Sequence, residues 1–86
     1  MAKNLTPAER QRQAVALRKM SAPIKAMLDG LIEAFQQEVV AFEKEIDPNG
    51  EEMWGSLALG WALAKGIPAD EAHEFVSYIG EFTDLI

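Results

Sequence analysis

Residues 21–46 constrain the fold most strongly, because they carry the longest continuous helical pattern in the chain. Their apolar side chains recur at steps of three and four residues, the spacing that places them on one face of an α-helix. These side chains are Ile24, Met27, Leu28, Leu31, Ile32, Phe35, Val39, Phe42 and Ile46. A helix over residues 22–46 would be about 37 Å long, enough to span a small domain. We therefore predict an all-α fold, a compact bundle of three to four helices around one long central helix.

A basic helix is expected to precede the central one. Thr6 and Glu9 fit a capping box, with a proline between them at the first helical position. These signals predict a basic N-terminal helix over about residues 7–20. Pro23 disfavours a continuous helix at this point, and we expect the Ser21 side chain to cap the central helix over about residues 22–46.

Two further helices are expected after the central one. The Asp-Pro-Asn-Gly sequence of residues 47–50 strings four turn-forming residues together and ends the central helix. An apolar helix is then predicted over about residues 51–65, where Gly66 ends it. A C-terminal helix is predicted over about residues 68–84. We expect residues 1–86 to form a single helical domain.

The apolar helix predicted over residues 51–65 has hydrophobic side chains all round, which is typical of a helix covered on every side. Hydrophobic residues make up 49% of the 86-residue chain, and so small a body leaves many of them near its surface. We therefore expect a homo-oligomer, with a dimer through this helix or the C-terminal helix favoured. The two tryptophans lie one heptad apart and are expected to share a face. The candidate dimer or core contacts are Trp54, Leu57, Trp61, Phe75 and Ile79.

Charge is divided unevenly along the chain. Residues 1–25 have six basic residues and one acidic residue, a net charge of +5, whereas residues 26–86 have two basic and thirteen acidic residues, a net charge of −11. Such segregation describes either solvated faces or binding surfaces. The basic residues that could contact a partner are Arg10, Arg12, Arg18, Lys19 and Lys25. The residues expected to form an acidic face are Asp29, Glu33, Glu43, Glu51, Glu52, Asp70, Glu71, Glu74 and Glu81.

Residue types that support catalysis or metal binding are scarce. The chain has no cysteine and a single histidine, His73, so a zinc site and a nucleophilic centre lack the residues they need. Asp70, His73 and Glu74 have metal-ligand spacing, but a metal site in a bundle needs matching ligands from other helices. We therefore predict a protein that is not an enzyme and has no metal and no cofactor. No apolar run approaches the roughly 20 residues of a membrane span, and cysteine-free composition suits the cytoplasm.

Residues 61–79 resemble a helix-turn-helix in spacing, with Gly66 in the turn. The second helix of this pattern is acidic, and it carries no arginine, lysine, asparagine or glutamine with which to read bases. We interpret the pattern as a packed helical corner.

The function we favour is a small acidic protein-binding module that occludes a basic surface of a partner, such as a surface that normally holds nucleic acid. Carboxylates on a rigid helical body can imitate phosphates and speed encounter by electrostatic steering. Small phage-encoded inhibitors of bacterial defence share this character, an analogy of size and charge alone. Two alternatives stay open. One is a nucleic-acid-binding regulator that acts through the basic N-terminal helix, and the other is a structural or assembly subunit that oligomerises through the apolar helix.

Overall fold

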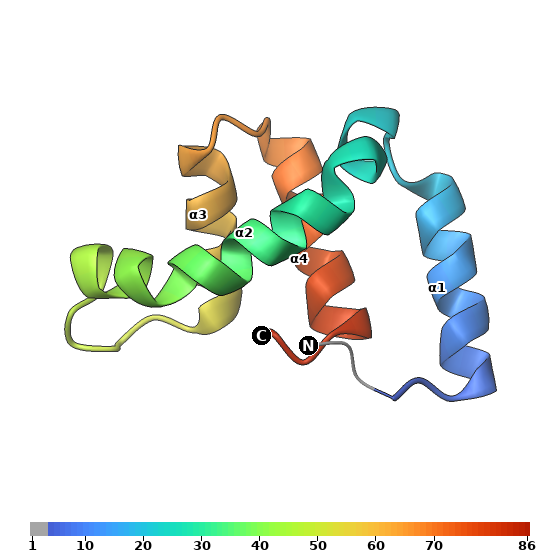
Figure 1. Ribbon diagram of the computed structural model, residues 1–86, viewed down its shortest axis with the longest axis horizontal. Helices are drawn as coiled ribbons and strands as arrows, with labels where there is room; N and C mark the ends of the chain where they lie inside the picture. Colours follow the sequence, from blue (N-terminus) through green and yellow to red (C-terminus); the bar gives the residue numbers. More distant parts are fainter. Residues whose placement is uncertain (1–3) are drawn as a thin grey trace.

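A long helix, α2, organises the computed structural model, which describes residues 4–86. The helices in chain order are α1 (Pro7–Lys19), α2 (Ala22–Ile46), α3 (Trp54–Ala64) and α4 (Ala69–Phe82). No strand occurs among the described residues, so the predicted all-α bundle is confirmed. Figure 1 shows α2 crossing α3 and α4, while α1 lies on the side of α4 away from α3. None of the described helices is both long enough and apolar enough to cross a membrane.

Three aromatic rings, one from each of α2, α3 and α4, meet at the centre of the fold. Phe35, Trp61 and Phe75 are 0%, 1% and 0% exposed. The ring centroids of Phe35 and Trp61 lie 5.4 Å apart in an edge-to-face arrangement, and Phe75 lies 6.3 Å from Phe35 and 5.9 Å from Trp61. Edge-to-face and tilted contacts are preferred because a ring's positive edge meets its neighbour's negative face. This aromatic cluster fixes how the three helices cross.

A tight turn sets the corner between α3 and α4. Gly66 adopts a positive φ of 88°, a conformation that favours glycine. Its amide donates to the Leu63 carbonyl at 3.0 Å, and the Ile67 amide donates to the Ala62 carbonyl at 3.2 Å. These two bonds form a Schellman motif and satisfy carbonyls at the end of α3. Small buried residues let the two helices pack closely: Ala58 and Ala62 on α3 and Ala72 on α4.

The α2–α3 loop is held by the buried carboxylate of Asp47. Its Oδ1 atom accepts a hydrogen bond from the Glu51 amide at 3.0 Å, and its Oδ2 atom accepts one from the Glu52 amide at 2.9 Å. Gly50, with a φ of 67°, completes the turn by donating its amide to the Asp47 carbonyl at 3.0 Å. Because Asp47 holds these amides in the loop, α3 begins at Trp54, later than residue 51, where we expected it. Glu51 and Glu52 therefore precede the helix.

The starts of α1 and α2 differ in how they are capped. At the start of α1 the expected capping box is confirmed: the Glu9 amide donates to Thr6 Oγ1 at 3.2 Å, and the Thr6 amide donates to Glu9 Oε1 at 3.0 Å. At the corner that follows, the expectation for Ser21 was wrong, because its side chain makes no cap hydrogen bond to α2. The Ser21 amide instead donates to Glu74 Oε2 of α4 at 2.9 Å, and the Ser21 hydroxyl is buried with no hydrogen-bond partner in the described part of the chain.

Loss of one ring from the aromatic cluster should destabilise the domain strongly. We expect Phe35→Ala to lower the free energy of unfolding by about 3–5 kcal/mol through lost burial and the cavity left behind. That is a large part of the roughly 5–15 kcal/mol typical of a whole domain. Urea denaturation followed by circular dichroism measures the change. The matched control is Val40→Ala on the exposed side of the same helix, for which we expect a change within about 0.5 kcal/mol; equal losses in the two variants would contradict the assigned core.

Candidate functional site

The contact between α1 and α4 brings residues from the two oppositely charged parts of the chain together. Arg12 Nε lies 3.2 Å from Glu81 Oε1 in an ion pair, and Gln13 Nε2 donates to the Tyr78 hydroxyl at 2.9 Å. We call this contact the α1–α4 seam and define it by Arg12, Gln13, Ala16, Lys19, Glu74, Tyr78 and Glu81. Two of the nine predicted acidic-face residues, Glu74 and Glu81, therefore face α1.

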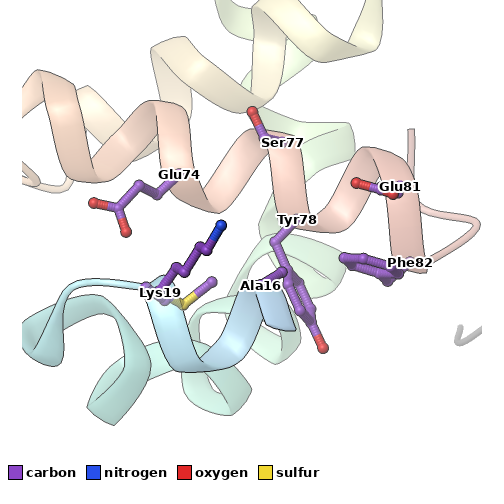
Figure 2. A pocket seen from close by; sticks show the side chains of 8 residues that line it. Ala16, Lys19, Glu74, Ser77, Tyr78, Glu81 and Phe82 are labelled. Atoms are coloured by element: carbon purple, nitrogen blue, oxygen red, sulfur yellow. The ribbon is translucent and has the colours of Figure 1, made fainter. Parts of the chain in front are cut away.

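The seam contains a pocket of about 200 Å³. Figure 2 shows the Lys19 ammonium reaching toward α4, whereas the Glu74 carboxylate points away from this ammonium and accepts a hydrogen bond from the Ser21 amide. Ala16 and Tyr78 lie side by side at its wall, and Phe82 closes one end. On the α1 side the pocket is lined by the small Ala16 side chain and by Lys19, with Met20 just after the helix.

The charges of the seam are in register. Arg12 and Lys19 are seven residues apart on α1, and Glu74 and Glu81 are seven residues apart on α4. A seven-residue step returns to nearly the same side of a helix after two turns. The two helices run in opposite directions (Figure 1), so Arg12 pairs with Glu81 at one end, while Lys19 and Glu74 line the pocket at the other end without forming an ion pair.

The seam holds α1 only weakly. No residue of α1 is buried, and the side chains of Arg12 and Glu81 remain 60% and 49% exposed. Ion pairs exposed to this degree contribute about 0–1 kcal/mol. Partly buried apolar side chains at Leu5, Leu17 and Met20 supply the rest of the docking contact. We conclude that α1 is the least firmly held helix of the four described.

The other seven predicted acidic residues lie outside the seam, and we call them the open carboxylates. They are Asp29, Glu33 and Glu43 on α2, Glu51 and Glu52 in the α2–α3 loop, and Asp70 and Glu71 at the start of α4. All are exposed except Glu43 and Glu71, which are half-buried. Among residues 4–86 none of the seven forms an ion pair. Their negative charge is therefore not cancelled by a direct contact within the described chain.

The five predicted basic contact residues share one neighbourhood, α1 and the start of α2, and all are exposed. Arg12 is paired with Glu81, whereas Arg10, Arg18, Lys19 and Lys25 form no ion pair with any described residue. The predicted basic helix is therefore present, with one of its cations used in docking.

The five candidate dimer or core residues divide into two groups. Leu57, Trp61, Phe75 and Ile79 are fully buried within the monomer. Trp54 is 39% exposed, so the two tryptophans do not share one environment. Two other apolar side chains of this region are exposed, Met53 just before α3 and Leu63 near its C-terminal end. A homodimer through α3 stays a prediction.

Sequence reasoning missed a polar cluster around Trp61. Glu38 Oε1 accepts a hydrogen bond from the indole Nε1 at 3.2 Å and pairs with Lys65 Nζ at 2.6 Å. The Lys65 ammonium also lies 5.5 Å from the centroid of the Trp61 ring. A groove of about 490 Å³ between α2 and α3 adjoins the cluster. The signal available in the sequence was Trp61 itself, because a buried indole N–H requires an acceptor.

No metal centre is formed among the described residues, where no group of three or more His, Cys, Asp or Glu side chains converges. Of the three residues with metal-ligand spacing, Glu74 binds the Ser21 amide. What the described surface offers is charged and apolar contact area. No family model, curated protein or solved structure matches this chain.

The Glu38 cluster should be visible in a pH titration. The hydrogen bond from Lys65, and next the one from Trp61, hold the pKa of Glu38 below its ordinary value of 4.5. A lowered folded-state pKa adds stability that is present above the unfolded-state pKa and is lost as the pH falls through the folded-state pKa. Lys65→Ala should therefore raise the Glu38 pKa and reduce the loss of stability below about pH 4.5.

NMR titration of the Glu38 carboxyl carbon measures this shift directly. Lys44→Ala is the matched control. It also removes one lysine charge, but Lys44 lies on α2 and forms no ion pair with a described residue. An unchanged Glu38 pKa in Lys65→Ala would contradict the assigned cause.

Proposed function

We propose that this chain is a non-catalytic protein-binding module whose acidic surface docks on a basic surface of a partner protein and occludes it. The observation that carries the proposal is the set of seven open carboxylates, which have no ion-pair partner among the described residues. Residues 26–86 contain only two cations, Lys44 and Lys65, and Lys65 is already paired with Glu38. An uncancelled field of this kind accelerates encounter with a surface of opposite charge.

The helical body suits this role because it holds its carboxylates at fixed spacing. Asp29 and Glu33 are four residues apart, so they project from neighbouring turns of α2 on the side opposite buried Leu28 and Phe35. A rigid array loses less conformational freedom on binding than a flexible acidic tail. Basic surfaces that accept the regularly spaced phosphates of a nucleic acid are one class of partner that this array would fit.

A cytoplasmic location and a homodimer belong to the same proposal. The cysteine-free composition supports the first. The exposed Met53, Trp54 and Leu63 side chains support the second, since apolar groups around α3 offer contact area to another copy.

Reversing two open carboxylates should abolish partner capture. We expect Asp29→Lys with Glu33→Lys to lose a specifically retained protein in a pull-down from bacterial lysate, by about tenfold or more, through like-charge repulsion. The matched control is Glu45→Lys with Asp84→Lys, which makes the same change in net charge at two exposed acids outside the predicted face. Equal loss of the retained protein in both double variants would contradict the proposal, because it would show that capture depends on net charge alone.

A nucleic-acid-binding regulator is the second candidate, favoured by the four exposed cations of α1 and early α2 that have no ion-pair partner in the described chain. Under this alternative, duplex DNA would bind with an affinity that falls steeply with salt concentration, and Arg10→Ala with Arg18→Ala would flatten that dependence by roughly two counterions. Fluorescence anisotropy across a salt series decides between the two. Under the leading proposal we expect no measurable duplex binding at physiological salt.

A further inference from the structure

The α1–α4 seam has the features of a binding surface that the chain's own helix occupies incompletely. The pocket of about 200 Å³ remains between the two helices where Ala16 faces Tyr78 and Phe82. A longer apolar side chain at the Ala16 position would fill it. At the α1–α2 corner the Ser21 hydroxyl is buried without a hydrogen-bond partner among the described residues, and an unpaired buried hydroxyl costs free energy in this arrangement.

The charges and side chains of the seam also indicate what kind of helix would bind there. Glu74 and Glu81 place two carboxylates seven residues apart on α4. Arg12 pairs with Glu81, and Lys19 stands seven residues after Arg12 on α1 without forming an ion pair among the described residues. Tyr78, between the two carboxylates, accepts a hydrogen bond on its hydroxyl oxygen from Gln13 Nε2 at 2.9 Å. An incoming helix therefore needs cations seven residues apart on one flank and an apolar residue between them. A helix with a larger residue than alanine at that central position would fit better than α1.

We propose that α1 is an internal placeholder, and that the partner docks a basic amphipathic helix of this description into the α1–α4 seam by displacing it. This inference rests on the proposed function, since it adds the structural form of the basic partner. It assigns Glu74 and Glu81 to the same partner as the open carboxylates, but only after α1 has moved. The apparent affinity for the partner is then reduced by the fraction of molecules in which α1 is docked.

A peptide that copies residues 4–21 with the substitution Ala16→Leu is a suitable probe, used with the full chain. We expect the peptide to bind Arg12→Glu chain about tenfold more tightly than wild-type chain, because the introduced carboxylate repels Glu81 and frees the seam. Gln13→Ala, which removes the bond to Tyr78, should shift the affinity in the same direction. The substitution Ala16→Leu in the chain itself should fill the pocket, raise the midpoint of thermal unfolding and weaken peptide binding.

Charge reversal tests whether the peptide occupies the seam. The Glu81→Lys chain should no longer bind the Ala16→Leu peptide, which retains Arg12. It should bind a second peptide that carries both Ala16→Leu and Arg12→Glu. Equal affinity of one peptide for wild-type, Arg12→Glu and Glu81→Lys chains would overturn the inference, as would no binding to any of them. Far-UV circular dichroism of each variant verifies that the other helices are intact.

Two results distinguish docking of a partner helix from exchange of α1 between two copies, and the seam inference from the proposed function. A stable heterodimer formed on mixing Arg12→Glu and Glu81→Lys chains would overturn the partner helix in favour of a second copy, since α1 exchange restores both ion pairs. The proposed function can fail independently: peptide binding that follows the seam variants would stand even if Asp29→Lys with Glu33→Lys had no effect on partner capture. Conversely, an effect of that double variant without peptide binding would remove the seam inference alone.

Discussion

The contact among Phe35, Trp61 and Phe75 is the interaction on which the rest of the structure depends. Each ring comes from a different helix, so burying the three together fixes the crossing of α2, α3 and α4 in a single step. The same contact brings the indole N–H of Trp61 to the edge of the core, where it needs an acceptor. Glu38 supplies that acceptor and is itself held by Lys65. A surface ion pair is thus a direct consequence of how the core is packed.

Helix α1, which lies outside this aromatic contact, is held by different interactions. α1 contributes no ring to the aromatic cluster and has no buried residue. It is positioned by the Arg12–Glu81 ion pair, by the hydrogen bond from Gln13 to the Tyr78 hydroxyl and by a few partly buried apolar side chains. The result is a three-helix body with strong internal packing and a basic helix attached along one side. This division follows the division of charge in the sequence.

Much of the fold could be predicted from the sequence because its signals are local. The apolar spacing of α2, the Thr6 and Glu9 capping box and the glycine at the α3–α4 turn each act within a few residues. The start of α3 could not be predicted in the same way, since it depends on the Asp47 carboxylate binding two amides across the turn. The role of Ser21 likewise depends on Glu74, which is 53 residues away in the chain.

The candidate site was predictable as a list of charges and not as an arrangement. Sequence reasoning placed Glu74 and Glu81 among the other acids, and only the docking of α1 separates these two from the open carboxylates. Glu38 was overlooked because its importance comes from the indole edge it meets, and helical periodicity alone does not identify that contact. In both cases the missing information is which helix lies beside which.

The ion pair that joins α1 to α4 links residues 69 positions apart, and this separation has a consequence for synthesis. Chains grow from the N-terminus, so α1 leaves the ribosome while α4 has yet to be translated. Throughout that interval Arg12 lacks its native partner Glu81, and it is available to ribosomal RNA or to other anionic surfaces nearby. The contact that withdraws Arg12 from such competitors can therefore form only after α4 has been synthesised.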